Sequence, residues 1–527
     1  MALANFFHRA AMAASQILSG FDPAAFAERL KEKPVGLAFD SAALRSPEGA
    51  ATLDLSVRLL ARLYPIISLR ALDAKAQPGS AGLAALARSI NPDIEIAQAG
   101  TLAACIVVGR TPAAPGCPIF FAGSDGWTAL LSRSGPVGSG VSSVPFGAGA
   151  AACLAAANVF RIIFGDQLAG GDPDYEIALS LLDYGRDGAR TPAAAGKQPV
   201  DLGEAHLVGL GAIGNGAVWA LSRCKTVSGT LHLVDDETLD LPNLQRYVLG
   251  EQADVGRAKV EIAEAAFRLG RLQIVPHRSV WRDYVSGRGQ WTFDRLAVGV
   301  DTAEVRIAIQ GALPRWIVNA WTQDLDLGVS RHGFDDGGPC LACLYLPAGK
   351  VKDEDERLAE ELMMPEARME VRRMLQTDMP LDDAFVRRVA AALSVPAEPL
   401  LAFVGRPLRA LHRNAICGGL AFKLNGGATK VGAVVPMAFQ SALAGILLSA
   451  ELVKNAMGIA GPVVTRVNLL RPLAPHLHDP VAKDRSGRCI CADNDFIEAY
   501  RLKYDCGRRP VAPSETADNT RLRAGRG

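Results

Sequence analysis

The stretch HLVGLGAIGNG, residues 206–216, runs from an apolar, strand-like segment directly into a glycine-rich turn. Gly209, Gly211 and Gly214 form the pattern G-x-G-x-x-G, and a helix-like segment, AIGNGAVWALSRC, follows. In this order of strand, turn and helix, the backbone approaches a phosphate closely and the first helical N–H groups face its charge. Asp235 ends the next strand-like segment, where a carboxylate can accept hydrogen bonds from ribose hydroxyls. The stretch predicts a Rossmann-like nucleotide site. The alternative is a glycine turn that only packs the helix on the strand. These residues alone do not distinguish an NAD site from an ATP site.

Strand-like and helix-like segments alternate on the C-terminal side of this stretch. The strands read TLHLVDD, LQIVPHRS, RLAVGVD, RWIVNAW and DLGVSRHGF, and the helix GRAKVEIAEAAFRLG lies among them. This alternation predicts an α/β fold with a doubly wound parallel sheet. A charged stretch of helical period interrupts the pattern before the sheet domain resumes. The predicted domains are 1–200, 201–347, a helical insertion over 348–413, 414–506, and a disordered tail over 507–527 that is almost without bulky apolar side chains.

Composition excludes several classes of protein. The 527 residues are 49% hydrophobic and 21% charged, with a net charge of +1, so nothing indicates binding to nucleic acid or to an anionic membrane. The longest apolar stretch, 144–165, contains Asn158 and Arg161 and is expected to be a buried helix and not a membrane span. The N-terminal segment resembles an amphipathic helix more than a secretory signal. Ten cysteines in so long a chain indicate reduced thiols and a cytoplasmic protein.

One segment of the N-terminal half is similar in sequence to a segment of the C-terminal half. FGAGAAACLAAANVFR (146–161) aligns with FQSALAGILLSAELVK (439–454) at a constant offset, which pairs Phe146 with Phe439. Upstream, PVGLAFD and YPIISLRALD can be the first two strands of a second sheet. Similar composition of two alanine-rich helices is the alternative explanation. The first half lacks a G-x-G-x-x-G turn after its first strand, so it is expected not to hold a nucleotide in the same way.

Four further motifs follow the glycine loop in a fixed order. They are NLQR (243–246), DVGRAK (254–259), DTAEVR (301–306) and GGPCLACLY (337–345). Together with the loop and the strand-end acid, they resemble the superfamily of ubiquitin-activating enzymes and bacterial ThiF-like sulfur-carrier adenylyltransferases. The resemblance covers roughly residues 200–346 and 414–495. Thr302 stands where the family has asparagine, which is a departure in one motif, and Arg306 can brace the fold instead of acting on a ligand.

The resemblance implies an ATP site, and the chemistry agrees with it. Adenylation of a carboxylate builds charge on the phosphoryl groups, so cations must surround the triphosphate. In the family, the residues that match Arg246 and Lys259 contact ATP, and the residue that matches Asp301 holds Mg²⁺, which prefers carboxylate oxygens. Asn243 and Asn215 are further candidates for contacts to the nucleotide.

Two close cysteine pairs suggest a structural zinc site. A CxxC and a CxC on elements that meet in a completed sheet fit tetrahedral Zn²⁺. The family has CxxC in both places, so loss of the metal is an open alternative, as are ligation by His476 or His478 and plain buried thiols. The four cysteines are Cys340, Cys343, Cys489 and Cys491.

Cys417 lies in RNAICGGLAFK, where the family has its crossover loop. Several members keep a cysteine there, and in activating enzymes it takes the acyl group from the adenylate as a thioester. An accessible thiol near cations suits a nucleophile, and His412, Arg413 and Lys423 are close in sequence. The alternative is a structural cysteine in a glycine turn.

The sequence therefore predicts a pseudo-dimer within one chain, in which an inactive adenylation-like half is fused to an active one. The resemblance implies ATP-dependent activation of a ubiquitin-like protein, a thioester on Cys417 and transfer to a conjugating enzyme. It is most similar to the activating enzymes of bacterial ubiquitin-like conjugation operons, some of which serve antiviral defence. One alternative is a sulfur-carrier adenylyltransferase that stops at the acyl-adenylate, and another is a non-enzymatic scaffold or an NAD-binding regulator.

Overall fold

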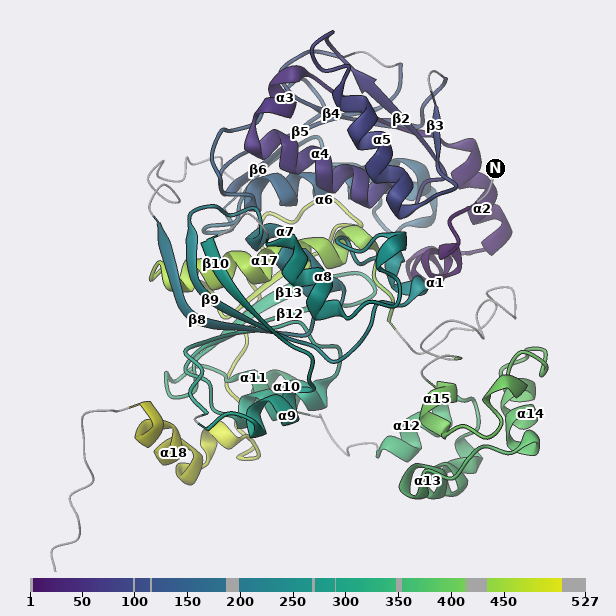
Figure 1. The fold of residues 1–527 in the computed structure, drawn as a ribbon, viewed down its shortest axis with the longest axis vertical. Helices are drawn as coiled ribbons and strands as arrows, with labels where there is room; N and C mark the ends of the chain where they lie inside the picture. The colour runs from purple at the N-terminus through teal and green to yellow at the C-terminus, as the bar shows by residue number, and fades with distance from the viewer. Residues whose placement is uncertain are drawn as a thin grey trace, which may run out of the picture.

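A computed structural model describes residues 3–97, 100–113, 116–185, 199–267, 271–289, 291–346, 353–412, 415 and 434–504. Figure 1 shows two sheet-containing halves, with the N-terminal half at the top and the C-terminal half below it. Long helices lie between the two sheets. A group of short helices stands apart from both, at the lower right.

The first sheet contains, in the part of the chain described, seven strands in the order β3-β2-β1-β4-β5-β6-β7. The strands β1 to β5 pair in parallel, whereas β5–β6 and β6–β7 are antiparallel. The strands are β1 (Val35–Phe39), β2 (Ile66–Ala71), β3 (Glu95–Ala97), β4 (Ala104–Val108), β5 (Ile119–Asp125), β6 (Thr128–Ser132) and β7 (Glu176–Ser180). Two of them are the strands predicted from PVGLAFD and YPIISLRALD.

The second sheet repeats this topology strand for strand. Its order over the described residues is β10-β9-β8-β11-β12-β13-β14, again with the last two pairings antiparallel. The expectation of an all-parallel sheet was therefore wrong at one edge, because β12 and β13 are joined by a tight connection that only antiparallel neighbours can use. The strands are β8 (Val200–Val208), β9 (Val227–Val234), β10 (Arg271–His277), β11 (Arg295–Val298), β12 (Ile317–Thr322), β13 (Leu327–His332) and β14 (Val464–Val467).

Helices cover the sheets in both halves. The first half has α1 (Phe7–Ile17), α2 (Pro23–Glu32), α3 (Ser41–Arg45), α4 (Pro47–Leu60), α5 (Gly79–Ile90), α6 (Phe146–Phe164) and the 3₁₀ turn η1 (Gly165–Gln167). The second has α7 (Ala212–Leu221), α8 (Lys259–Ala266), α9 (Trp281–Ser286), α10 (Ala303–Gly311), α11 (Leu341–Tyr345), α17 (Ala438–Ala456) and α18 (Asn494–Tyr504), with 3₁₀ turns η2 (Leu241–Gln245), η3 (Gln252–Asp254) and η7 (Ile490–Ala492).

The two echoing sequence segments are the helices α6 and α17. Each has 19 residues, follows the sixth strand of its sheet and precedes the seventh. The helices contact one another in the centre of the molecule (Figure 1). The segment Phe146–Gln167 is long and apolar enough to cross a membrane, but 94% of that window is buried inside the fold. It is therefore the buried core helix that its small residues predicted.

The two halves share one continuous hydrophobic core and several polar contacts. Asp54 on α4 accepts hydrogen bonds from Trp219 Nε1 at 2.7 Å and from Arg223 Nη2 at 2.8 Å. At the other end of the contact, Tyr184 and Arg331 both bond to Glu451 on α17. Because core and polar groups are shared in this way, each half supports the other.

The predicted insertion is a helical cluster with its own core. It contains α12 (Glu354–Glu361), η4 (Pro365–Ala367), α13 (Arg368–Thr377), α14 (Asp383–Ala392), η5 (Leu401–Phe403) and α15 (Leu408–Leu411). Their apolar side chains form a core cluster separate from the others. The predicted disordered tail lies outside the described residues.

Candidate active site

The glycine loop joins β8 to the N-terminus of α7. Gly209 has φ +89°, a left-handed conformation that disfavours other residues. A Cβ on Gly214 would lie 2.2 Å from the carbonyl oxygen of Gly209, so the turn closes only with glycine there. Gly211 is the N-cap of α7 and has no side chain to occupy the free N–H groups of the first turn. The loop therefore has the geometry of an anion site at a helix N-terminus.

Asp235 follows β9 and ties the loop to its neighbour. Its Oδ2 accepts a hydrogen bond from Leu210 N at 2.7 Å, and its Oδ1 accepts one from Glu237 N at 2.9 Å. Burial raises the pKa of this carboxyl, and the charge of Lys259 opposes that rise. The carboxylate thus stands at the crevice beside the glycine loop, where the sequence predicted a ribose contact.

Lys259 begins α8 and points inward. Its side chain is 4% exposed, and Nζ bonds to Glu237 and donates to Tyr247 Oη at 3.2 Å. Burial lowers the pKa of this ammonium, but Tyr247, Asp235 and Glu237 outweigh burial and raise the pKa above its ordinary value. Lys259 is therefore a fixed positive charge. A small pocket lies between Lys259, Tyr247, Leu210 and Asn215, beside the glycine loop.

Arg246 lies on the other side of the same tyrosine. Its guanidinium carbon is 5.6 Å from the centre of the Tyr247 ring, and Lys259 Nζ is 5.1 Å from that centre. Burial lowers the pKa of Arg246, and the charges of Tyr247 and Asp301 oppose that effect. Its Nη1 is enclosed and has no hydrogen-bond partner. The two predicted cations thus converge on one ring; Lys259 is buried, and Arg246 is half-buried with its Nη1 enclosed.

The residues of the DTAEVR motif have two different environments: Asp301 is exposed, whereas Thr302 and Arg306 support the fold. Asp301 follows β11 and is exposed. Thr302 is the N-cap of α10 and accepts a hydrogen bond from Val305 N at 3.3 Å, which explains how threonine replaces the family's asparagine. Arg306 is buried and donates to Asn319 Oδ1 at 2.9 Å and to the carbonyl groups of residues 300 and 301. It stabilises the ends of the neighbouring strands β11 and β12, in agreement with the alternative expectation that Arg306 braces the fold.

The two candidate asparagines are held by backbone groups. Asn215 Nδ2 donates to the carbonyl of Leu210 at 2.9 Å, and its Oδ1 accepts from Leu249 N at 3.2 Å. Asn243 Oδ1 accepts from Asp240 N at 3.0 Å, within η2. Both side chains position the loops around the site; both polar atoms of Asn215 are engaged, and so is Oδ1 of Asn243.

Sequence reasoning missed the residues that hold this site from the first half. Arg62 is 1% exposed and donates through Nη2 to the carbonyls of Tyr247 at 2.6 Å and Gly250 at 2.7 Å. Arg58 donates to the carbonyl of Val248 at 3.0 Å. No motif marks these arginines, because their role depends on the contact between the halves.

The four paired cysteines come together in one cluster. Their Sγ atoms lie 3.4 to 3.9 Å apart in the pairs that touch, and all four ligand atoms lie within 4.8 Å of one another. Tetrahedral Zn²⁺ with Zn–S bonds of about 2.3 Å requires separations of about 3.8 Å. The backbone N–H of Asp484 points to Cys343 Sγ at 3.5 Å, which suits a thiolate. The residues present therefore fit zinc in spite of the shorter CxC spacing.

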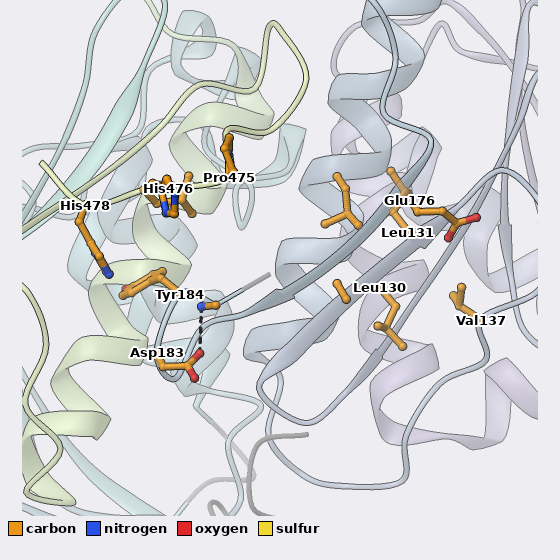
Figure 2. Close-up of a pocket in the computed structure, with 13 residues that line it drawn as sticks. Leu130, Leu131, Val137, Glu176, Asp183, Tyr184, Pro475, His476 and His478 are labelled. Carbon is orange, nitrogen blue, oxygen red and sulfur yellow. Dashed lines mark hydrogen bonds between the residues drawn. The ribbon is translucent and has the colours of Figure 1, made fainter. Parts of the chain in front are cut away.

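His476 and His478 lie elsewhere and are not part of this cluster. They line a pocket of about 670 Å³ between the two halves, where His478 lies beside Tyr184 and Leu130, Val137 and Glu176 lie across from it (Figure 2). The idea that they substitute for cysteine ligands was therefore wrong, because the segment that carries them runs beside β14 toward the first half.

Cys417 lies outside the described residues. Of the basic residues near it in sequence, His412 is described, and its Nε2 bonds to Glu361 of the insertion. Arg413 and Lys423 lie outside the described residues as well. Among the remaining cysteines, Cys105, Cys153 and Cys224 are buried and Cys117 is half-buried.

Two protein-family models match parts of the chain. The model of the ThiF family matches residues 190–312, which contain the glycine loop, both cations and the Asp301 motif. The chain belongs to the ThiF/E1-like adenylyltransferase superfamily. A second model, Prokaryotic E2 family C, matches residues 38–165 of the first half.

Two curated proteins are similar to this chain over stretches of very different length. Uncharacterized protein y4jF of Sinorhizobium fredii (strain NBRC 101917 / NGR234) is 55% identical over 515 residues, which is 97% of this chain and 99% of that protein. Adenylyltransferase and sulfurtransferase MOCS3-2 of Zea mays is 26% identical over 178 residues, or 32% of this chain and 34% of that protein.

Solved structures of E. coli MccB are also similar. The structure with MccA-N7isoASN has a TM-score of 0.35 at 14% identity, and the structure with ATP has a TM-score of 0.33 at 14% identity. Each covers 55% of this chain and 67% of the MccB chain. Scores this low add nothing to the assignment.

Proposed function

We propose that this chain uses ATP to adenylate the C-terminal carboxylate of a small protein of the ubiquitin-like class. The observation that carries the proposal is the convergence of Lys259 and Arg246 on the ring of Tyr247, whose hydroxyl lies beside Gly211 of the glycine loop. Lys259 is withdrawn from bulk solvent, and the buried Nη1 of Arg246 lacks a partner. Leaving a charged group unpaired in the interior is costly, so an anionic ligand is the natural partner. A hydride-transfer site has no need of these two cations.

The proposed reaction is a substitution at the α-phosphorus of ATP. A carboxylate oxygen of the acyl partner forms a P–O bond, the bond to the β,γ-phosphates breaks, and pyrophosphate leaves. Lys259 and Arg246 would stabilise the charge that grows on the phosphoryl oxygens, and Asp235 would hold the ribose. Mg²⁺, held by Asp301, would supply further neutralisation of the triphosphate when bound.

The second proposed step uses Cys417. Its thiolate would attack the acyl carbon of the adenylate, a thioester would form and AMP would leave, after which a conjugating enzyme takes the acyl group. The support for this step is the family resemblance and the position of the cysteine between the insertion and α17. The activity belongs to the cytoplasm, where ATP and reduced thiols are present, and the resemblance favours a role in bacterial antiviral defence.

A structural Zn²⁺ on the four-cysteine cluster completes the proposed second half. The cluster joins the segment before α11 to η7, and so would fix the C-terminal helix α18 against the sheet domain. The Cys340, Cys343, Cys489 and Cys491 thiolates would be the only protein ligands, because the observed separations suit tetrahedral sulfur coordination.

We further propose that the first half is an inactive partner and not a second catalytic unit. Residues 38–165 match a family named for conjugating enzymes, which require a reactive thiol. The cysteines of this segment are Cys105, Cys117 and Cys153, and burial raises the pKa of all three, that of Cys105 to about 12. Thiols of this kind are protonated at neutral pH, which does not suit a nucleophile.

The proposal is tested by ATP–pyrophosphate exchange with a ubiquitin-like protein that ends in glycine. The same protein with its C-terminus amidated is the control, since it lacks the attacking carboxylate. Exchange is expected with the free carboxylate and is expected to disappear in Asp301→Ala. Normal exchange in Asp301→Ala would refute the assignment of this residue, and no exchange in the unmodified chain would refute the function.

Thioester formation distinguishes the proposed function from the alternative, a sulfur-carrier adenylyltransferase. In Cys417→Ala, exchange is expected to persist while the DTT-sensitive conjugate with the partner is lost. If the unmodified chain exchanges pyrophosphate but forms no such conjugate, the alternative holds.

A further inference from the structure

A cluster of three histidines and a glutamate lies on the second sheet, away from the four cysteines. Glu204 and His206 are two residues apart on β8 and so face the same side of the sheet. His232 on β9 pairs directly with His206 in the strand register. Two side chains from one strand and a third from the adjacent position of its neighbour form a compact tripod, on the sheet face that α9 covers.

The donor atoms of this tripod are spaced for a metal ion. Glu204 Oε1 lies 3.2 Å from His232 Nε2 and 3.5 Å from His206 Nε2. The ligand atoms of the three residues all lie within 4.8 Å of one another. Tetrahedral Zn²⁺ with bonds of about 2.0–2.2 Å to nitrogen and oxygen separates its ligand atoms by about 3.4 Å.

His206 is the independent sign of a missing ligand. It is 0% exposed, and neither of its ring nitrogens meets the geometry of a hydrogen bond, although Glu204 Oε1 lies 3.5 Å from Nε2 and the backbone of Arg295 is close to the ring. A buried polar group without a partner is destabilising, and a bound cation would supply that partner. The ring nitrogen of an imidazole that carries no proton offers a lone pair to a cation.

The surroundings hold the tripod in place and leave an opening. His232 Nδ1 lies 2.9 Å from His277 Nε2, so the second ring can fix the tautomer of the first. Arg288 Nη2 donates to Glu204 Oε1 at 2.6 Å. A carboxylate has about four lone-pair sites and can hold a cation while it accepts from arginine. The Glu204 side chain is 46% exposed, so an ion and its water can enter from solvent.

We propose that Glu204, His206 and His232 bind a divalent transition-metal ion of the Zn²⁺ class, with water completing its coordination. Imidazole and carboxylate donors suit this class better than Mg²⁺ or Ca²⁺, which prefer oxygen alone. The ion would link β8 to β9 on the face opposite α7, where it does not touch the proposed ATP site. The role is therefore structural, and the proposal is independent of the adenylation chemistry.

The test is the number of zinc ions that the full chain retains after zinc loading and dialysis. The double variant Glu204→Gln/His232→Gln is expected to retain one equivalent fewer than the unmodified chain. His476→Gln, which changes an exposed histidine outside the cluster, is the matched control and is expected to lose none. Equal zinc content in the double variant and the unmodified chain would overturn the proposal.

Cobalt(II) added to the metal-free chain distinguishes the two kinds of site, even if a variant folds poorly. The unmodified chain is expected to show weak bands of nitrogen and oxygen ligation, and these are expected to persist in Cys489→Ser, which removes a thiolate of the other cluster. Cobalt bound in the unmodified chain through thiolates alone would overturn the proposal.

Discussion

The two halves of this chain share one sheet topology and differ at the turn that follows the first strand. In the second half this turn is the glycine loop, and the N–H groups at the start of α7 are left for a ligand. In the first half Asp40 fills the same place. Its Oδ1 accepts from Ala43 N at 2.8 Å, and its Oδ2 accepts from Arg110 N at 2.7 Å and Thr111 N at 2.9 Å.

A protein carboxylate has thus taken the position of a bound anion. A Cβ on Gly109, which follows β4, would lie 2.3 Å from the Asp40 carboxyl group, so this side chain fills the space beside the turn. The helix that follows the second strand differs as well, because α8 begins with Lys259 whereas α5 begins with Gly79. The comparison teaches that one fold becomes a scaffold or a site through a few side chains at the ends of its strands.

The largest expected effect is that of Lys259→Ala in the second half. The variant removes a buried cation beside the glycine loop, and loss of one such electrostatic group typically costs about 10²–10³ in rate. Pyrophosphate exchange should fall by that factor. Arg257→Ala, which removes an exposed arginine two residues earlier, is the control. An equal loss in both variants would contradict a specific role for Lys259.

The next effect concerns the contact between the halves. Arg62→Ala leaves the carbonyls of Tyr247 and Gly250 without their donor, and each buried unsatisfied group costs about 1–3 kcal/mol. The free energy of unfolding in urea should fall by about 2–5 kcal/mol, and affinity for ATP should weaken because this segment lines the pocket. Arg88→Ala, an exposed arginine on α5, should change neither. Unchanged ATP affinity in Arg62→Ala would show that the first half does not shape the site.

The smallest effect on activity is expected for Asp40→Asn in the first half. Pyrophosphate exchange should be unchanged, since this carboxylate serves the half that we propose to be inactive. The free energy of unfolding at pH 7 should fall by about 1–3 kcal/mol as charged hydrogen bonds are lost. A loss of pyrophosphate exchange in Asp40→Asn would contradict the proposed difference in role between the two halves.

The same substitution has a predictable pH dependence. Burial raises the pKa of Asp40, but hydrogen bonds from Ala43, Arg110 and Thr111 outweigh it, so the pKa lies below the ordinary value. A depressed carboxyl pKa stabilises the fold above the unfolded pKa, and that stability is lost as the pH falls through the folded pKa. The stability difference between the unmodified chain and Asp40→Asn should therefore shrink below about pH 4. Asp93→Asn, which replaces an exposed acid, is the matched control.

Much of the fold could be predicted because it depends on local pattern. Strand periodicity gave the β8 and β9 segments, and the echo between residues 146–161 and 439–454 gave the paired helices α6 and α17. The glycine loop and the strand-end acid Asp235 could be predicted because their spacing is a property of one βαβ unit. What failed was the edge of each sheet, since the direction of β13 and β14 depends on pairing and not on composition.

The sequence by itself indicated the candidate residues, since Gly209 and the cysteine pairs follow from spacing and Lys259 follows from the resemblance to ThiF-like proteins. Only the tertiary structure decided which distant groups support them. Arg62 of the first half donates to the carbonyl of Tyr247 in the second half. Asp40 accepts hydrogen bonds at the turn after β1, and Glu204 on β8 lies next to His232 on the neighbouring strand β9. These contacts join residues far apart in sequence, so they are set by how the sheets and helices pack, which no local pattern encodes.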